Sequence, residues 1–248
     1  MARTVAVETI PNYGRLVRTV LISARLLTAA AIVAAIAAQL IASLSFVGPR
    51  GQPDTAPVVV NYLSYFTIDS NTLAAIVLVV SAVMLARGAR AEPRGLTVAR
   101  VAVTTYMIIT GVVYNLLLRG SLEQGATVAW SNEILHLGGP LYLVLDWTFA
   151  PGRHRLSWGD AVPALAFPTV WVAYTLVRGP FATNPYVDAA YWYPYPFLNP
   201  VTSTGGYASV AAYVLGIAVV TILLAVGLAW TTRRRRALAS HRPRPDPG

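Results

Sequence analysis

The sequence contains no cysteine among its 248 residues. This absence excludes disulfide bonds, thiolate zinc sites, cysteine-ligated iron–sulfur clusters and a cysteine nucleophile. Lysine is also absent, so all 19 basic residues are arginine. Any catalytic or binding chemistry must therefore come from other side chains.

Charged residues are scarce as well: they make up 12% of the chain, whereas hydrophobic residues make up 56%. Soluble globular proteins carry about 25% charged residues, so this chain cannot build a water-exposed surface for one or two domains of its size. The formal net charge is +9. Because the arginines lie between apolar runs, without a basic face interleaved with aromatics, nucleic-acid binding is not expected. The composition predicts an integral membrane protein surrounded by membrane lipids.

Six apolar stretches dominate the chain, each close to the ~20 residues with which an α-helix crosses ~30 Å of hydrocarbon. A membrane β-barrel would need segments of about ten residues that alternate apolar and polar, and these Ala/Leu/Val/Ile blocks do not alternate. We therefore predict an all-α fold, a polytopic membrane helical bundle with six transmembrane helices. The expected spans cover residues 26–46, 58–85, 98–118, 127–149, 161–177 and 207–230.

The arginines predict the orientation of this bundle. Every second loop, beginning with the N-terminal segment, is rich in arginine, whereas the other loops hold only Arg50, Arg119 and Arg178. Because cytoplasmic loops keep the positive charge, both termini are expected to be cytoplasmic. The first apolar run exceeds the core of about 7 to 15 residues in a signal peptide, so it is expected to remain as a span. The domain plan is a cytoplasmic segment (1–25), a six-span membrane domain (26–232) and a basic, disordered cytoplasmic tail (233–248).

The outer loop 179–206 differs from the others because it is long and rich in aromatic residues and proline. Aromatic side chains favour the headgroup layer, where the ring and the polar tip each find a suitable solvent. We expect this loop to lie on the outer surface as a lid. An aromatic belt that only seats the bundle in the membrane is the alternative interpretation. The residues assigned to the lid are Tyr191, Trp192, Tyr195 and Phe197.

Polar residues within the predicted spans are few, and ionisable groups in hydrocarbon cost a few kcal/mol, so each is a candidate for function. Span 58–85 carries Thr67, Ser70 and Asn71 on one helical face. Asp69 lies about 200° round the helix axis from Thr67.

Span 127–149 carries a second polar group. Asn132 and Glu133 precede His136 by four and three residues, so the three are expected to share one face. Thr67 and His136 each lie nine residues past the start of a span that runs inward. With ~1.5 Å of rise per residue, both are expected roughly 14 Å below the outer surface. This equal depth permits contact between them.

A hydroxyl beside a histidine is a minimal nucleophile–base pair, because a hydroxyl reacts usefully only when a neighbouring base takes its proton. We therefore assign Thr67 and His136 as candidate catalytic residues. The alternative is structural: a threonine commonly bonds back to its own helix, and a membrane histidine can serve packing. The predicted supporting groups are Asn132 or Glu133, to orient the imidazole, and Asn71 or Ser70, to donate to an oxyanion, with Asp69 nearby.

No metal or cofactor is expected. A catalytic zinc usually has at least two nitrogen or sulfur ligands, and His136 is the only histidine within the predicted spans. Asp146, near the inner end of span 127–149, is interpreted as a structural partner of an arginine on the cytoplasmic side.

Four runs carry a family resemblance: SYFTIDSN at 64–71, YNLLL at 114–118, NEILHLGGPLYLVLDW at 132–147 and YPYPFLNP at 193–200. Together they resemble the bacterial branch of the androgen-induced membrane protein family, over residues 25–230. Members of this family elsewhere include fatty-acid-ester hydrolases that use an intramembrane threonine and histidine. The resemblance implies that Thr67 is the nucleophile and His136 its histidine.

These observations favour a multi-pass hydrolase of the bacterial plasma membrane that cleaves a lipid ester through an acyl-threonine. The alternative is a non-enzymatic membrane protein that binds lipid or a partner; a carrier is a third interpretation, although no span is evidently broken into paired half-helices. For the hydrolase, we expect an apolar pocket that opens toward the outer leaflet or under residues 191–197, and not on the cytoplasmic side.

Overall fold

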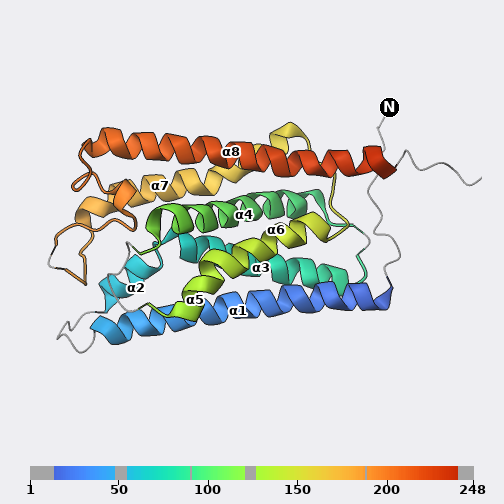
Figure 1. Cartoon of the computed structure of the whole chain (residues 1–248), viewed down its shortest axis with the longest axis horizontal. Helices are drawn as coiled ribbons and strands as arrows, with labels where there is room; N and C mark the ends of the chain where they lie inside the picture. Colours follow the sequence, from blue (N-terminus) through green and yellow to red (C-terminus); the bar gives the residue numbers. More distant parts are fainter. Residues whose placement is uncertain (1–13, 48–54, 90, 121–126, 188, 240–248) are drawn as a thin grey trace, which may run out of the picture.

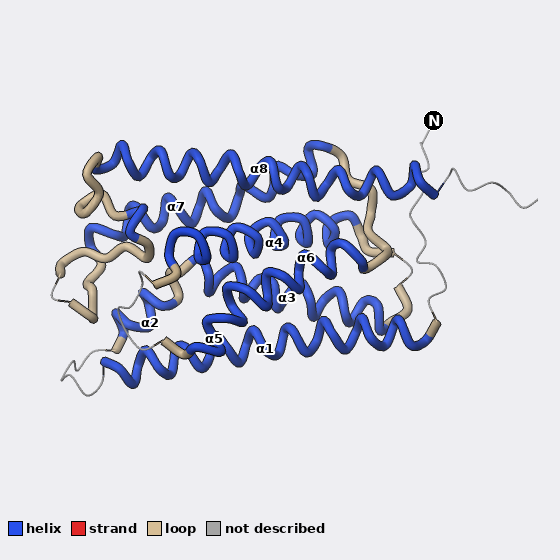
Figure 2. The backbone as a smooth tube through the Cα atoms, in the orientation of Figure 1, coloured by secondary structure: helices blue, strands red, loops and turns tan. Residues whose placement is uncertain are grey.

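A computed structural model describes residues 14–47, 55–89, 91–120, 127–187 and 189–239. These residues form helices, turns and loops without a strand (Figure 2). A single antiparallel bridge pairs Asn184 with Ala189. The long helices run side by side along one axis as a bundle (Figure 1). The predicted all-α class is confirmed.

Five helical segments of the described chain are long and apolar enough to cross a membrane, judged by length and composition. Large apolar side chains cover their outward faces, such as Leu27, Ile41 and Leu215, each more than 60% exposed. A surface of this kind suits lipid hydrocarbon and not water. The five segments are Arg15–Phe46, Phe66–Ala86, Arg94–Leu118, Trp158–Phe181 and Gly206–Arg233.

The first three helices depart from the predicted boundaries. Helix α1 covers Arg15–Val47, so the end of the expected N-terminal segment is already helical. The second predicted span is not one helix: α2 covers Ala56–Tyr62 and α3 covers Phe66–Ala86, with residues 63–65 between them. Thr67 therefore lies in the first turn of α3. The depth calculated for it from a continuous helix starting at residue 58 does not apply.

Contacts with helix α7 (Ala166–Arg178) accompany the break between α2 and α3. A helix end leaves backbone carbonyls without intrahelical partners, and the Ser64 carbonyl here accepts a hydrogen bond from Trp171 Nε1 at 3.1 Å. Ser64 Oγ donates to the Val60 carbonyl at 2.6 Å and lies 2.9 Å from the Tyr174 hydroxyl. These partners satisfy polar groups that a broken helix would otherwise leave unpaired in the membrane.

Two of the inner helices are joined to π-helical turns. Helix α4 (Arg94–Val113) continues into the π turn η2 (Tyr114–Leu118). The short helix α5 (Ala129–Glu133) reaches α6 (Gly139–Phe149) through a second π turn, η3 (Ile134–Gly138). π turns are rare and often mark functional sites.

The last part of the chain returns along the bundle twice. A 3₁₀ helix, η4 (Trp158–Leu165), leads into α7, which ends in η5 (Gly179–Phe181). The outer loop contains the turn η6 (Pro196–Leu198), and α8 follows as Gly206–Ala239. Residues 233–239, predicted to be disordered, are therefore helical. Residues 1–13 and 240–248 of the predicted terminal segments lie outside the described residues.

A buried ion network joins α1, α4 and α6. Asp146 accepts hydrogen bonds from Arg25 Nε at 2.9 Å and from Arg100 Nη2 at 2.5 Å. Arg100 also donates to Glu92 at 2.5 Å. All four side chains are at most 8% exposed. The predicted pairing of Asp146 with an arginine is confirmed, with two arginines instead of one; we call these four residues the inner cluster.

The start of α1 and the end of α8 lie at the same end of the bundle (Figure 1). Two described arginines lie at the opposite end of the bundle. Arg119 directly follows η2, and Arg178 is the last residue of α7. The other described arginines belong to segments at or toward the end where α1 begins and α8 ends: Arg15, Arg18, Arg25, Arg87, Arg94, Arg100, Arg153, Arg155 and Arg233 to Arg236.

Candidate active site

The two candidate catalytic side chains meet at the start of α3. Thr67 Oγ1 lies 3.3 Å from His136 Nε2, although the two residues are 69 positions apart in the sequence. Thr67 is buried, and His136 is half-buried within η3. The structure therefore brings together the pair that the sequence singled out.

A backbone carbonyl fixes the orientation and tautomer of His136. The His136 Nδ1 atom lies 3.0 Å from the Asn132 carbonyl oxygen. A carbonyl can only accept, so Nδ1 carries the proton in this hydrogen bond. In a neutral imidazole Nε2 is then unprotonated and accepts the hydrogen bond from the Thr67 hydroxyl. This arrangement is the one that a general base requires.

An aromatic ring also packs on the face of the His136 imidazole. The Tyr114 ring stacks on His136 with centroids 3.7 Å apart and planes 20° apart. Asn132 Nδ2 donates to the Tyr114 hydroxyl at 2.6 Å, and the Arg119 guanidinium lies 5.3 Å from the centre of the Tyr114 ring. Tyr114 was not assigned to the site from the sequence, although it begins the YNLLL run.

The predicted orienting role of Asn132 and Glu133 needs correction. The Asn132 backbone, not its side chain, binds the imidazole. Glu133 points outward and pairs with Arg119 at 2.7 Å, with both side chains more than 40% exposed. The π turn that follows Glu133 changes the 3.6-residue periodicity on which the shared-face prediction depended.

Tyr195 from the outer loop completes the contacts of Thr67. Its hydroxyl lies 3.3 Å from Thr67 Oγ1 and accepts a hydrogen bond from the Thr67 backbone N–H at 3.3 Å. Because the Thr67 hydroxyl proton is directed to His136, the Tyr195 O–H donates to Thr67 Oγ1. Tyr195 was predicted to belong to a lid, and its contact with Thr67 was not predicted because nothing in the sequence pattern links the loop to α3.

Ser70 and Asn71 do not point donors at the pair. Asn71 Nδ2 donates to the carbonyls of Thr67 and Leu135, at 2.9 and 3.1 Å. Ser70 Oγ lies 3.2 Å from the Thr67 carbonyl and 3.0 Å from Thr110 Oγ1. Both donors are thus used inside the bundle, which corrects the predicted oxyanion role. Asp69 is half-buried on another face of α3.

Two asparagines support the π turn that carries His136. Pro140 has no N–H, so carbonyls four and five residues before it lose a helical donor. Asn71 donates to one of these, the Leu135 carbonyl, at 3.1 Å. Asn115 donates to the other, the His136 carbonyl, at 3.1 Å. These side chains explain how a distorted turn persists inside an apolar bundle.

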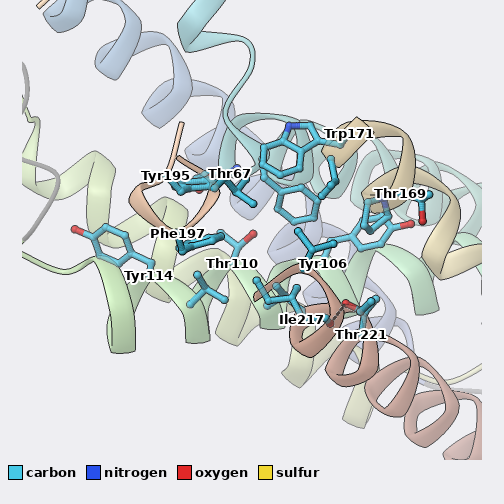
Figure 3. A pocket seen from close by; sticks show the side chains of 18 of the residues that line it. Thr67, Tyr106, Thr110, Tyr114, Thr169, Trp171, Tyr195, Phe197, Ile217 and Thr221 are labelled. Carbon is cyan, nitrogen blue, oxygen red and sulfur yellow. Dashed lines mark hydrogen bonds between the residues drawn. The ribbon is translucent and has the colours of Figure 1, made fainter. Parts of the chain in front are cut away.

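Two cavities meet at Thr67. A polar cavity of about 480 Å³ is lined by Thr67, His136 and Asn132 together with residues of α1 and α2. An apolar pocket of about 170 Å³ lies between α3, α4, α7 and α8 (Figure 3). Four residues line both: Thr67, Tyr114, Leu118 and Tyr195. Neither cavity is lined by a residue of the inner cluster.

The predicted lid residues have different positions. Tyr195 and Phe197 line the apolar pocket (Figure 3). Trp192 is buried, with its ring edge-on to Tyr65 at 5.4 Å, and Tyr191 contacts Tyr193 at 6.5 Å between ring centres. Two of the four predicted lid residues, Tyr195 and Phe197, therefore belong to the cavity wall, whereas Trp192 packs on Tyr65 and Tyr191 packs on Tyr193.

Within the described ranges, no three His, Asp or Glu side chains gather closely enough to hold a metal ion. No family model, curated protein or solved structure matches this chain.

Proposed function

We propose that the protein hydrolyses an acyl ester within the membrane, with Thr67 as the nucleophile and His136 as the general base. The observation that carries this proposal is the Thr67 Oγ1–His136 Nε2 contact of 3.3 Å, with Nδ1 anchored on a carbonyl and both side chains facing a cavity. A hydrogen bond of this length is typical of an unliganded site, where catalytic contacts tighten on substrate binding. The family resemblance around both residues supports the same assignment.

In the first half-reaction, Thr67 Oγ1 attacks the ester carbonyl carbon while His136 Nε2 takes the hydroxyl proton. The carbonyl oxygen becomes an oxyanion, and the Tyr195 O–H turns from Thr67 Oγ1 to donate to it. The bond from carbon to the alcohol oxygen then breaks. The leaving alcohol takes the proton from His136, and an acyl-threonine remains.

In the second half-reaction, water from the polar cavity attacks the acyl-threonine. His136 takes a proton from this water, and the bond from the acyl carbon to Thr67 Oγ1 breaks. Thr67 recovers its proton from His136, and the carboxylic acid leaves. Tyr195 can donate to both oxyanions because its hydroxyl already lies beside Thr67 Oγ1, and stabilisation of this kind is commonly a large contribution to such catalysis.

The proposal includes a membrane topology of six crossings with both termini in the cytoplasm of a bacterial cell. The α5, η3 and α6 segments follow one another over residues 129–149, which at ~1.5 Å per residue is long enough to cross ~30 Å. The unequal division of arginines between the two ends of the bundle supports the orientation. Reporter fusions after Arg94, Arg155 and Arg236 are expected to read cytoplasmic. Fusions after Asp54, Glu123 and Asp188 are expected to read periplasmic, and a periplasmic reading after Arg236 would contradict six spans.

Ester turnover by purified protein tests the catalytic assignment. Wild type is expected to hydrolyse p-nitrophenyl butyrate, and Thr67→Ala is expected to abolish this activity. Thr72→Ala is the matched control, because Thr72 lies on the same helix and its hydroxyl donates to the Ile68 carbonyl one turn earlier. Activity that is absent in wild type, or equal in wild type and Thr67→Ala, would favour the alternative of a non-enzymatic lipid-binding protein.

A further inference from the structure

The candidate nucleophile lies at the boundary between two cavities that differ in polarity. The polar cavity is lined by amide, hydroxyl and imidazole groups together with apolar side chains such as Ile68 and Leu135, whereas the apolar pocket is lined mainly by aliphatic and aromatic side chains. Thr67 and Tyr195 belong to both linings. An ester whose carbonyl reaches Thr67 can therefore extend in two directions, one apolar and one polar.

The apolar pocket has the properties of a site for a hydrocarbon chain. Thr67 and Tyr195 lie on one side of it, and Thr169 and Thr221 lie on the opposite side (Figure 3). The hydroxyl of Thr221 donates to the Ile217 carbonyl at 2.7 Å, so this hydroxyl is already satisfied by its own helix. The pocket thus presents few unsatisfied polar groups to a chain.

One face of α8 forms the far wall of this pocket. Val214, Ile217, Ala218 and Thr221 line it, and their spacing of three and four residues puts them on one side of the helix. From the first to the last of these residues the helix rises roughly 10 Å. Leu215 on the same helix does not line the pocket and is 66% exposed. This face can therefore limit the length of a bound chain.

The polar cavity contains no Asp, Glu, Lys or Arg among the described residues that line it. The two described arginines at this end do not line it: Arg178 donates to Asn61 at 2.5 Å, and Arg119 pairs with Glu133 at 2.7 Å. A charged group that entered this cavity would lose hydration and would meet no side chain of opposite charge in the described lining. Uncharged hydroxyl groups would instead meet neutral amide and hydroxyl side chains such as Ser43, Asn61 and Asn132.

We infer that the substrate is an acyl ester of an uncharged, hydroxyl-bearing alcohol. Its acyl chain lies in the pocket between α4, α7 and α8, and its alcohol part lies in the polar cavity. The inference rests on the proposed function, and it assigns Ile217 and Ala218 as residues that determine the preferred chain length.

A chain-length series tests the acyl site. The purified protein in detergent would be assayed with p-nitrophenyl esters from acetate to dodecanoate. Ala218→Trp is expected to lower kcat/KM for the dodecanoate by at least ~10-fold while the acetate changes by less than about 2-fold, because the added ring fills the pocket beyond the carbonyl. Ile217→Ala is expected to shift the profile the other way, toward longer chains. Leu215→Trp, on the outward face of α8, is the control and should keep the wild-type profile.

These outcomes separate the two proposals. If wild type hydrolyses the acetate, and Thr67→Ala does not, the proposed function holds whatever the chain-length profile. Under that condition, identical profiles for wild type, Ala218→Trp and Ile217→Ala would overturn the acyl site. If Ala218→Trp fails to fold, Ile217→Ala decides alone, because it only removes side-chain atoms from the pocket wall.

The alcohol part is tested with wild type alone. Glycerol monolaurate, lauroyl lysophosphatidylglycerol and lauroyl lysophosphatidylcholine would be compared at equal mole fraction in the same micelles. We expect the glycerol ester to be cleaved at least ~10-fold faster than either phospholipid, because only its head group is uncharged. Equal or faster cleavage of the anionic phospholipid would overturn the inference of an uncharged alcohol.

Discussion

The two buried polar clusters of this bundle are built in opposite ways. In the inner cluster, Arg25 and Arg100 surround Asp146 with hydrogen bonds of 2.5 to 3.3 Å, and the adjoining cavity is only about 20 Å³. The outer cluster, which comprises Thr67, His136, Tyr195 and Tyr114, holds Thr67 by contacts of 3.3 Å and borders a cavity of about 480 Å³.

This difference separates a structural role from a chemical one. Opposite charges at short distance fix three helices to one another, and breaking such a buried pair leaves an uncompensated charge. Longer contacts between a hydroxyl, an imidazole and a phenol leave room for a reacting atom, and they cost less to rearrange. The inner cluster is therefore expected to determine stability, and the outer cluster to determine activity.

The largest effect should come from the outer cluster. His136→Gln and Thr67→Ala are each expected to lower kcat for an ester by about 10⁴-fold, which corresponds to roughly 5 kcal/mol of transition-state stabilisation. The melting temperature of both variants should stay within a few degrees of wild type. Turnover and thermal unfolding of the same preparations would be measured. Loss of folding together with activity would mean that the outer cluster is structural, and would contradict the difference in role between the two clusters.

The inner cluster should show the reverse. Asp146→Asn is expected to lower the free energy of unfolding by about 3–5 kcal/mol, because two buried arginines lose their carboxylate. Unfolding in sodium dodecyl sulfate would measure this loss. Turnover per folded molecule should remain near wild type. A large fall in turnover at unchanged stability would instead assign Asp146 to the chemistry.

A smaller effect is expected from the Tyr195 hydroxyl. Tyr195→Phe keeps the ring contacts with Trp171 and Phe197 and removes the donor to Thr67 Oγ1, so kcat should fall on the order of 10²-fold. Tyr193→Phe is the matched control, because the Tyr193 hydroxyl is hydrogen-bonded to Tyr207 at the start of α8 and not to Thr67. Equal kcat values for wild type and Tyr195→Phe would remove Tyr195 from the mechanism.

The smallest effect is expected from Glu133. Because the Asn132 carbonyl, and not this carboxylate, binds His136 Nδ1, Glu133→Gln should change kcat by less than about 2-fold, as for an exposed ion pair. A pH–rate profile would be recorded for the variant and for wild type. A fall of ten-fold or more would restore the carboxylate as the group that orients the imidazole.

Composition and apolar run lengths were sufficient to predict the helical membrane class, because hydrocarbon tolerates backbone only as helices or closed barrels. The break after Tyr62 was not predictable, since it is accompanied by the distant hydrogen bond from Trp171 to the Ser64 carbonyl. Likewise, α8 continues through residues 233–239, which include the charged run Arg233 to Arg236 and were predicted to belong to a disordered tail.

In the candidate site, too, local sequence features were predictive and contacts between distant segments were not. Thr67 and His136 could be found from the sequence because polar residues are rare within apolar spans. The partners of this pair depend on π turns and on a loop, which helical periodicity does not describe. Thus Tyr114 was missed, Tyr195 was assigned to a lid, and Glu133 was expected to face the imidazole.

The most direct test of the central claim is to locate the covalent bond. Purified protein would be treated with a fluorophosphonate probe, digested, and analysed by mass spectrometry for the modified peptide. We predict one probe-derived adduct on Thr67, lost in Thr67→Ala, strongly reduced in His136→Gln and retained in Thr72→Ala. No adduct in wild type, or an adduct on a residue other than Thr67, would contradict the assignment of Thr67 as the nucleophile.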